Sequence, residues 1–401
     1  MSERIMSERR KAVAFVMDEF PCGGAERVTT DVARYLAENG YKVYVIASDY
    51  HNEKMGACEL EAGFEVVELP RRRGLRSRQY AAELAQSIKG LELSAVVFTK
   101  MSRRLPMVVR LAGTPSVCVN HGQVLWEIPT ILMWFRERAS RKRLKYGLRW
   151  LCYDSIRYKV FGSLARKYKT RYRAIINAVD RYAVLCEEYK KETIKRLGLS
   201  DRSEGKIVVL ENSCAVPAAV NKEKSKSIIY VGRLTYPDKR VDRLIEIWRK
   251  VCGSLPEWTF TIVGDGDERE NLQRQAAGLP RVEFAGHQTD VSPYYQKASI
   301  LCLTSAIESW GLCLMEAQSY GVVPVAFDCS AGVRTLLSPS GVNGVLAPDG
   351  DLDAYAESLL SLASDEACLA EMRENVLRKS ASYSYEVMGK KWLDVIEEIG
   401  R

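Results

Sequence analysis

The sequence lacks long apolar runs, has only three histidines and contains no Cys-x-x-Cys pair. A helix that spans a bilayer needs about 18 or more consecutive apolar residues, so we expect no transmembrane segment. Residues 1–11 are charged, and the apolar run after them is broken by Asp18 and Glu19, so we expect no signal peptide. The eleven cysteines are scattered singly, mostly in apolar runs. This favours reduced thiols in a cytoplasm over a disulfide frame or a zinc site.

The 401 residues are 47% hydrophobic and 27% charged, which is typical of a globular protein long enough for two domains. Largely apolar runs alternate with helical patterns, and this indicates parallel sheets covered on both faces. The runs are 13–17, 43–47, 66–69, 95–98, 117–119, 182–185 and 207–210, then 228–231, 259–263, 282–285, 300–303 and 323–326. We therefore predict an α/β fold with two Rossmann-like, doubly wound domains facing a central cleft, residues 1–220 and 221–380. A C-terminal helix, 381–401, would pack back on the first domain.

Two glutamates, Glu308 and Glu316, lie eight residues apart across a predicted loop-to-helix junction. Eight residues are a little over two helical turns, so Glu316 would lie below the loop that holds Glu308. The start of the helix, at Gly311 and Leu312, offers unpaired N–H groups and the positive end of the helix dipole, which suit a phosphate. The junction predicts a cradle for a sugar nucleotide. The alternative is an amphipathic helix with one solvated glutamate at each end.

A second loop follows the predicted strand 228–231 and reads Gly232-Arg233-Leu234-Thr235-Tyr236-Pro237-Asp238-Lys239-Arg240. Gly232 permits a tight turn, and Arg233 and Lys239 can converge on a diphosphate. A leaving nucleoside diphosphate needs such neutralisation, and two cations can replace a metal there. A basic surface loop is the alternative.

Four further features follow predicted strands, and each has a structural alternative. Gly23-Gly24 precedes a helix and would let a ligand approach the backbone, although a structural turn explains it equally well. His121, after strand 117–119, could orient a substrate hydroxyl or transfer a proton, or it could be a satisfied loop histidine. Gly264-Asp265-Gly266 favours close backbone approach to a nucleotide, with Asp265 in local turn hydrogen bonds rather than at a metal. The backbone of His287 could pair with a base edge.

In order and spacing these motifs resemble those of the family 4 retaining glycosyltransferases with the two-domain GT-B fold, of the type that builds bacterial cell-surface polysaccharide and lipopolysaccharide. The likeness runs through Gly232-Arg233-Leu234 with Lys239, Gly264-Asp265-Gly266, Gly286 with Asp290 and Tyr294, the Glu308/Glu316 pair, Gly321-Val322-Val323-Pro324-Val325 and, more loosely, residues 23–27, His121 and Asn212. Arg240 stands where the family usually has glycine, and Ser309-Trp310 replaces the common Gly-Phe. Both departures would lie beside the donor and bear on the identity of its sugar.

The resemblance implies roles for single residues. Arg233 and Lys239 would hold the donor diphosphate, and the amides of Gly311 and Leu312 would meet its phosphates. Glu316 would hold the ribose hydroxyls, and Glu308 would lie by the donor sugar, with His121 beside sugar and acceptor. The remaining donor contacts would come from Gly24, Gly232, Gly264, Asp265, Gly266, His287 and Trp310. The family retains anomeric configuration and needs no metal or other cofactor.

The segment 126–173 holds fourteen Lys and Arg and three acidic residues, a net charge of +11 in a chain whose total is +8. Its cations alternate with aromatic residues, which suits an anionic membrane surface. We expect acceptor or membrane contacts at Gly23, Trp134, Arg136, Arg141, Lys142, Arg143 and Trp150. Nucleic acid would also suit such a segment, and a solvated helical surface is the structural alternative.

The resemblance thus implies a metal-independent hexosyltransferase. It would move a hexose or N-acetylhexosamine from a nucleotide-diphosphate sugar, with UDP favoured, to a saccharide or lipid-linked acceptor in cell-envelope polysaccharide biosynthesis. We expect it in the cytoplasm, at the inner face of the cell membrane, with no nucleic acid bound. The alternatives are a sugar-nucleotide epimerase of the same fold and a non-catalytic nucleic-acid-binding protein.

Overall fold

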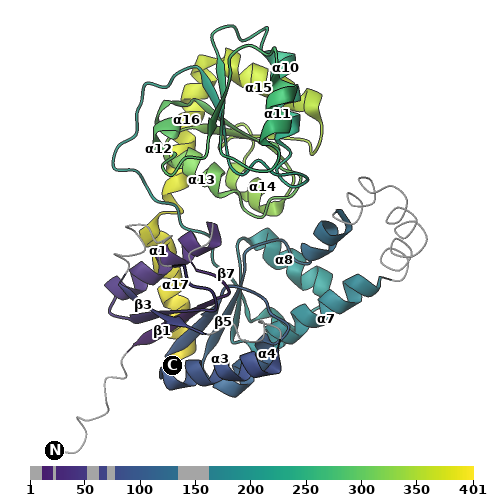
Figure 1. Cartoon of the computed structure of the whole chain (residues 1–401). Helices are drawn as coiled ribbons and strands as arrows, with labels where there is room; N and C mark the ends of the chain where they lie inside the picture. The colour runs from purple at the N-terminus through teal and green to yellow at the C-terminus, as the bar shows by residue number, and fades with distance from the viewer. Residues whose placement is uncertain (1–10, 21–23, 52–62, 70–76, 134–161) are drawn as a thin grey trace, which may run out of the picture. The chain divides into compact units, whose positions relative to one another are not determined.

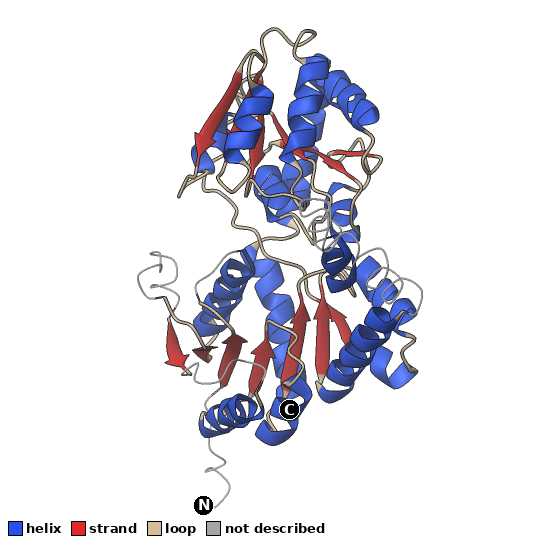
Figure 2. Cartoon of the chain, turned by 45° about the vertical axis from the view of Figure 1, so that its right-hand side comes forward, coloured by secondary structure: helices blue, strands red, loops and turns tan. Residues whose placement is uncertain are grey.

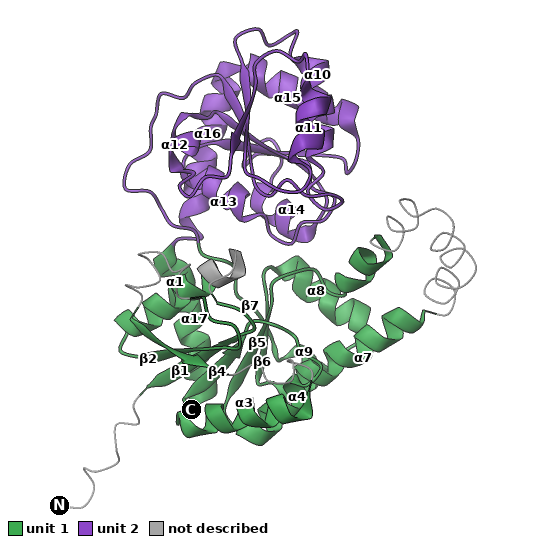
Figure 3. Ribbon diagram, in the orientation of Figure 1, with its two compact units in different colours: residues 1–213, 385–401 green, residues 214–384 purple. Residues whose placement is uncertain are grey.

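The computed structural model describes the chain except residues 1–10, 21–23, 52–62, 70–76 and 134–161 (Figure 1). The chain forms two compact units, residues 1–213 with 385–401 and residues 214–384 (Figure 3). The sequence predicted domain boundaries at 220/221 and 380/381. In the structure the chain passes from one unit to the other at 213/214 and at 384/385, a few residues away from each predicted boundary.

The first unit is built on a seven-stranded parallel sheet with the strand order β3-β2-β1-β4-β5-β6-β7. Its strands are β1 (Ala12–Met17), β2 (Lys42–Ala47), β3 (Phe64–Glu68), β4 (Ala95–Phe98), β5 (Ser116–Asn120), β6 (Arg181–Val184) and β7 (Ile207–Val209). The helices whose bounds the structure gives are α1 (Gly24–Glu38), α3 (Arg78–Gly90), α4 (Leu105–Ala112), α7 (Ser163–Ala178), α8 (Glu187–Leu197), α9 (Asp201–Glu204) and α17 (Tyr385–Gly400). The strand order reverses between β1 and β4, which makes the sheet doubly wound.

The core of the first unit explains why β1 and β4 are continuously apolar. All residues of β1 and β4 are buried, as expected for strands covered on both faces. The C-terminal helix α17 belongs to this core, because Trp392 lies 6.5 Å from Phe15 between ring centroids. A Cβ on Gly389 would lie 2.2 Å from the ring of Tyr35 on α1, so glycine permits the close crossing of the two helices.

The second unit has a six-stranded parallel sheet with the order β10-β9-β8-β11-β12-β13. Its strands are β8 (Ser227–Val231), β9 (Thr259–Val263), β10 (Val282–Gly286), β11 (Ile300–Leu303), β12 (Val323–Phe327) and β13 (Val345–Ala347). Its helices are α10 (Val241–Val251), α11 (Arg269–Ala276), α12 (Ser292–Lys297), α13 (Leu312–Ser319), α14 (Ala331–Leu337), α15 (Leu352–Ser364) and α16 (Glu366–Ala381). Helix α10 packs against α11 and α15, and α13 packs against α16.

Both sheets confirm the predicted α/β class with two doubly wound parallel sheets, and helices cover the sheet of each unit (Figure 2). Within the described ranges, no helix combines the length and the apolar composition that crossing a membrane needs. The predicted contacts of Gly23, Trp134, Arg136, Arg141, Lys142, Arg143 and Trp150 lie outside the described residues.

Candidate active site

The candidate site of the second unit lies at the carboxyl ends of its strands, where glycine-rich loops pack backbone to backbone. Gly232 N donates to the carbonyl of Val263 over 3.0 Å, and Gly264 N donates to that of Gly286 over 2.8 Å. A Cβ on Gly264, where φ is +138°, would lie 1.9 Å from the Gly232 carbonyl oxygen. Only glycine permits this approach, so these glycines hold the loops together in addition to any role toward a ligand.

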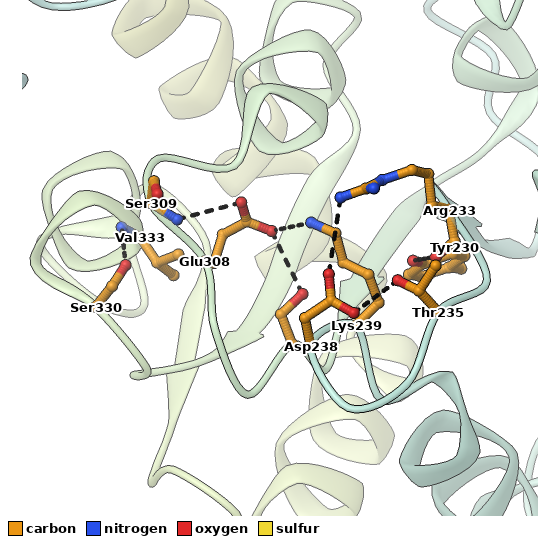
Figure 4. A network of polar contacts seen from close by, with 10 residues as sticks. Tyr230, Arg233, Thr235, Asp238, Lys239, Glu308, Ser309, Ser330 and Val333 are labelled. Carbon is orange, nitrogen blue, oxygen red and sulfur yellow. Dashed lines mark hydrogen bonds and ion pairs between the residues drawn. The ribbon is translucent and has the colours of Figure 1, made fainter. Parts of the chain in front are cut away.

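An ion pair between Lys239 and Glu308 joins the loop after β8 to the loop after β11 (Figure 4). Lys239 Nζ lies 2.6 Å from Glu308 Oε2, and the two side chains are only 18% and 12% exposed. Burial alone would lower the pKa of Lys239, but the Glu308 carboxylate outweighs it and the pKa is raised. Ser305 and the Ser309 amide also donate to Glu308. The lysine therefore stays charged, and the carboxylate is held in one place.

Asp238, which the sequence did not single out, fixes the loop that carries Arg233. Thr235 Oγ1 donates to Asp238 Oδ1 over 2.7 Å, and Arg233 Nη2 lies 3.7 Å from Asp238 Oδ2. The Asp238 carbonyl accepts from Ala306 N over 2.8 Å, which ties this loop to the one that holds Glu308. The Arg233 side chain is 74% exposed, so its guanidinium is the more accessible of the two predicted diphosphate contacts.

Arg240, the departure from the family's usual glycine, has the left-handed backbone conformation that glycine favours, with φ of +50°. Its guanidinium forms three hydrogen bonds to the carboxylate of Asp242, of 2.9, 3.1 and 2.8 Å, and lies over the ring of Tyr236. Asp242 is in the first turn of α10, so Arg240 is held at the start of that helix.

Glu316 lies on α13 and accepts a hydrogen bond of 3.0 Å from the hydroxyl of Tyr295 on α12. Tyr295 is buried and stacks on Tyr320 with ring centroids 5.5 Å apart. Burial, followed by the Glu316 charge, raises the pKa of Tyr295 well above its usual value, so its hydroxyl remains a donor. Sequence reasoning missed Tyr295, although the pair Tyr294-Tyr295 after a proline at a helix start was a visible signal.

Cys313, in the first turn of α13, lies among the charged residues of the site. Its thiol is close enough to Lys239, Glu308 and Glu316 for each charge to act on it. Burial raises the pKa of Cys313 to about 12, and Glu308 adds to the effect. The thiol is therefore protonated and a poor nucleophile.

The junction before α13 has the expected loop-to-helix form. Gly311 caps the helix with φ of +84°, and the helix begins at Leu312. Trp310, expected beside the donor, is instead 2% exposed, with its ring packed on Met315 and Tyr383. The Trp310 side chain therefore positions the loop from the core.

The loop after β9 uses Asp265 for local hydrogen bonds. Its carboxylate accepts from Gly266 N over 2.8 Å and from Arg269 over 2.8 Å, and the pKa of Asp265 is lowered, first by the Gly266 amide. His287, after β10, is exposed near this carboxylate. In the described parts of the chain, no three His, Cys, Asp or Glu side chains lie close enough together to hold a metal ion.

Two predicted residues belong to the first unit. Gly24 is the first residue of α1, and His121 follows β5. His121 Nε2 and the buried Asn120 Nδ2 have no hydrogen-bond partner among the described residues. Burial lowers the pKa of His121 to about 4, so the ring is neutral at pH 7. Two orphaned polar atoms side by side in sequence at a strand end suit a ligand's hydroxyl groups, and Asn120 was not among the predicted site residues.

Comparisons with known proteins agree with this architecture. The sequence profile described as "Glycosyltransferase Family 4" matches residues 22–213, and the one described as "Glycosyl transferases group 1" matches residues 225–365. The chain is similar to an uncharacterized glycosyltransferase of Haemophilus influenzae, 25% identical over 393 residues that cover 96% of this chain and 100% of that protein. It is also similar to the lipopolysaccharide 1,6-galactosyltransferase of Salmonella typhimurium, 31% identical over 188 residues, 44% of this chain and 50% of that one.

Among solved structures, Anabaena Alr3699/HepE in complex with UDP-glucose superimposes with a TM-score of 0.71 and 16% sequence identity, over 96% of this chain and 99% of the other. Both glycosyltransferase profiles match in order along one chain, each on one of the two doubly wound parallel-sheet units. The chain therefore belongs to the family 4 glycosyltransferases and has their GT-B fold.

Proposed function

We propose that this glycosyltransferase moves a hexose or N-acetylhexosamine, with retention of anomeric configuration, from a UDP-sugar to a saccharide or lipid-linked acceptor of a cell-envelope polysaccharide. The observation that carries the proposal is the partly buried Lys239–Glu308 ion pair, with Glu316 on the helix that follows, at the strand ends of one sheet. A charged lysine there suits a leaving diphosphate, and the two glutamates suit the hydroxyl groups of a nucleotide sugar.

Apart from Trp310, the predicted donor-site residues then have these roles. Lys239 and the exposed Arg233 contact the diphosphate, and the first amides of α13, at Gly311 and Leu312, meet its phosphates. Glu316, oriented by Tyr295, accepts hydrogen bonds from the ribose hydroxyls. We expect Glu308 to contact the donor sugar, and His121 to contact the sugar and the acceptor. Gly24, Gly232, Gly264, Asp265, Gly266 and His287 complete the set of donor contacts.

In the proposed reaction the bond between the anomeric carbon and the diphosphate oxygen breaks as the acceptor hydroxyl bonds to the same face of the sugar. The diphosphate departs with the electron pair of the broken bond and accepts the proton that the hydroxyl loses. Lys239 and Arg233 stabilise the departing charge, which lets the reaction proceed without a divalent metal. Product formation that survives a chelator supports this point.

The relatives support the choice of substrates. The structurally similar Anabaena protein was solved with UDP-glucose, and the Salmonella relative is named for galactose transfer onto lipopolysaccharide. The net charge of +11 in residues 126–173 suits an anionic membrane surface as a partner. We therefore place the reaction at the cytoplasmic face of the cell membrane.

A thermal-shift screen of nucleotide sugars tests the proposal, because a bound donor raises the melting temperature of the protein. We expect a UDP-sugar to give the largest shift, and Glu316→Ala and Lys239→Ala each to abolish it and to lower kcat/KM by about 100-fold or more. Lys250→Ala is the matched control, since Lys250 is an exposed lysine of the same unit, paired with Asp353.

Removal of Lys239 alone leaves the partly buried Glu308 carboxylate without its cationic partner and lowers stability. The double variant Lys239→Met/Glu308→Gln removes both charges and separates stability from binding. We expect the double variant to melt near wild type yet bind no donor. Wild-type activity in Glu316→Ala, or an epimerised free nucleotide sugar in place of a glycosidic product, contradicts the proposal.

A further inference from the structure

The segment 219–226, which leads into β8, is attached to the end of helix α12. Asn221 N donates to the side-chain oxygen of Gln296 over 2.7 Å, and the side-chain amide of Gln296 donates back to a main-chain carbonyl of the segment over 2.7 Å. Residues 221–226 are all polar, and of these six only Lys224 is not exposed. The segment therefore places one lysine against the protein while the neighbouring residues lie in solvent.

The last carbonyl groups of α12 form hydrogen bonds with this segment. A helix leaves its last four carbonyls without partners inside the helix. The ammonium group of Lys224 donates to two of those of α12, over 2.8 Å to Tyr295 and over 3.1 Å to Gln296. Ser225 N donates to a third, that of Lys297, over 2.8 Å. Helix α12 has only six residues, and a helix this short is not stable on its own, so this cap helps to hold it.

Lys224 is protonated at pH 7 although it is half-buried. Burial, followed by the charge of Arg373 on α16, lowers the pKa of Lys224 to about 8. An ammonium group has three N–H donors, and α12 accepts from it twice. Tyr295 is only 1% exposed, so water has little access to its carbonyl. Loss of the lysine would leave this buried carbonyl without a donor, which costs more than the hydrogen bond contributes.

Tyr295 connects the capped end of α12 to the candidate donor site. Its carbonyl accepts from Lys224, and its hydroxyl donates to Glu316 on α13 over 3.0 Å. Its ring stacks on Tyr320, at the end of α13. A displacement of the end of α12 therefore moves the hydroxyl that orients Glu316.

We propose that Lys224 is a positioning residue for the donor, which fixes Tyr295 and through it holds Glu316 where the ribose hydroxyls bind. The inference rests on the proposed function, in which Glu316 accepts from these hydroxyls. Lys224 precedes β8, whereas the donor loops follow the strands, so the lysine lies at the opposite edge of the sheet. It touches neither donor nor acceptor and acts through α12.

Calorimetric titration of the full chain with UDP and with 2′-deoxy-UDP tests the inference. The second nucleotide lacks one hydroxyl that Glu316 would bind, so the wild type should prefer UDP by at least about tenfold, the loss of a hydrogen bond to a charged group. Lys224→Met removes the ammonium group and keeps an apolar side chain. We expect it to weaken UDP binding by about fivefold and to reduce the preference for UDP to about twofold. A general loss of structure would instead weaken both nucleotides alike.

The matched control is Lys226→Met, because Lys226 is an exposed lysine of the same segment that pairs with Glu257. It should bind both nucleotides as the wild type does. Lys224→Gln is a milder change that keeps an N–H donor, and it should reduce the preference for UDP less than Lys224→Met does. Melting temperatures establish that each variant is folded during the titration.

A double-mutant cycle identifies the route by which Lys224 acts. Tyr295→Phe already removes the hydroxyl that orients Glu316, so adding Lys224→Met to it should cause no further loss of the preference for UDP. A wild-type preference in Lys224→Met, equal losses for both nucleotides, or losses that multiply in the double variant overturn the inference. In each of these cases Glu316→Ala still loses UDP binding. UDP binding that survives Glu316→Ala contradicts the proposed function instead, and the inference with it.

Discussion

At the residue scale, the charged side chains of the candidate donor site are held in position by hydrogen-bonding partners. Lys239 is paired with Glu308, and Glu316 with the hydroxyl of Tyr295. A buried polar group that loses its partner costs more than the hydrogen bond itself contributes. Each pair therefore fixes one carboxylate in the position where the proposed donor needs it, before the donor arrives.

Tyr295→Phe is expected to raise the donor KM by about tenfold, the loss of a hydrogen bond to a charged group, with little change in kcat. The ring remains, and only the hydroxyl that orients Glu316 is removed. Steady-state kinetics with varied donor, together with the melting temperature, check this. Tyr320→Phe, which keeps the ring that stacks on Tyr295, is the control. An unchanged donor KM in Tyr295→Phe would show that the hydroxyl has no positioning role.

His121 is expected to titrate near pH 4, because burial lowers the pKa of its imidazole to about 4. An unfolded chain binds this proton near pH 6.5, so the unfolded state holds more protons between these values. The free energy of unfolding is therefore unaffected by this group above about pH 6.5 and falls as the pH drops toward 4, by on the order of 1–2 kcal/mol at pH 5.

The imidazole C2–H resonance of His121 measures this titration, and His121→Asn assigns the resonance among the three histidines. The same variant should lose part of the destabilisation of the wild type between pH 6.5 and 5. A midpoint near pH 6.5, or an identical pH dependence in His121→Asn, contradicts the burial that the structure shows.

At the scale of elements, strands and their loops followed from the sequence because their causes are local. The run Val13 to Met17 is continuously apolar and forms β1, and the expected helix after the Glu308 loop is α13. The two loops carrying Lys239 and Glu308 were expected to share a site because parallel strands end at one edge of the sheet. Neither inference needs knowledge of distant contacts.

Side-chain directions could not be obtained in the same way, because they depend on residues distant in the sequence. The Trp310 side chain points into the core because it packs against the ring of Tyr383, with the two ring centroids 6.0 Å apart. Tyr295 on α12 and Glu316 on α13 lie on the helices before and after β11, and their side chains form a hydrogen bond. No pattern in the local sequence predicts this contact. The glycines of the donor loops were attributed to ligand approach, whereas the 1.9 Å contact that a Cβ on Gly264 would make is with the Gly232 carbonyl.

At the scale of the whole molecule, charge is concentrated in one part of the chain. Residues 126–173 carry a net +11, so the rest of the chain is slightly acidic. The described end of this segment, helix α7, has no acidic residue, and Arg166 and Lys167 are exposed on it. Such a distribution gives one segment a strong electrostatic attraction for anionic surfaces, while the rest of the protein has little tendency to bind them.

We expect the protein to sediment with vesicles of anionic phospholipid at low salt and to be released at high salt, where charges are screened beyond about 3 Å at 1 M. Arg166→Glu/Lys167→Glu reverses two charges of α7, and since each basic residue near the surface contributes about 1 kcal/mol, binding should weaken by at least about tenfold. Lys191→Glu/Lys195→Glu on α8 makes the same change in net charge on two exposed lysines elsewhere, and we expect a smaller loss. Equal binding to neutral vesicles, or equal losses in both variants, would mean that the basic segment is not the docking surface.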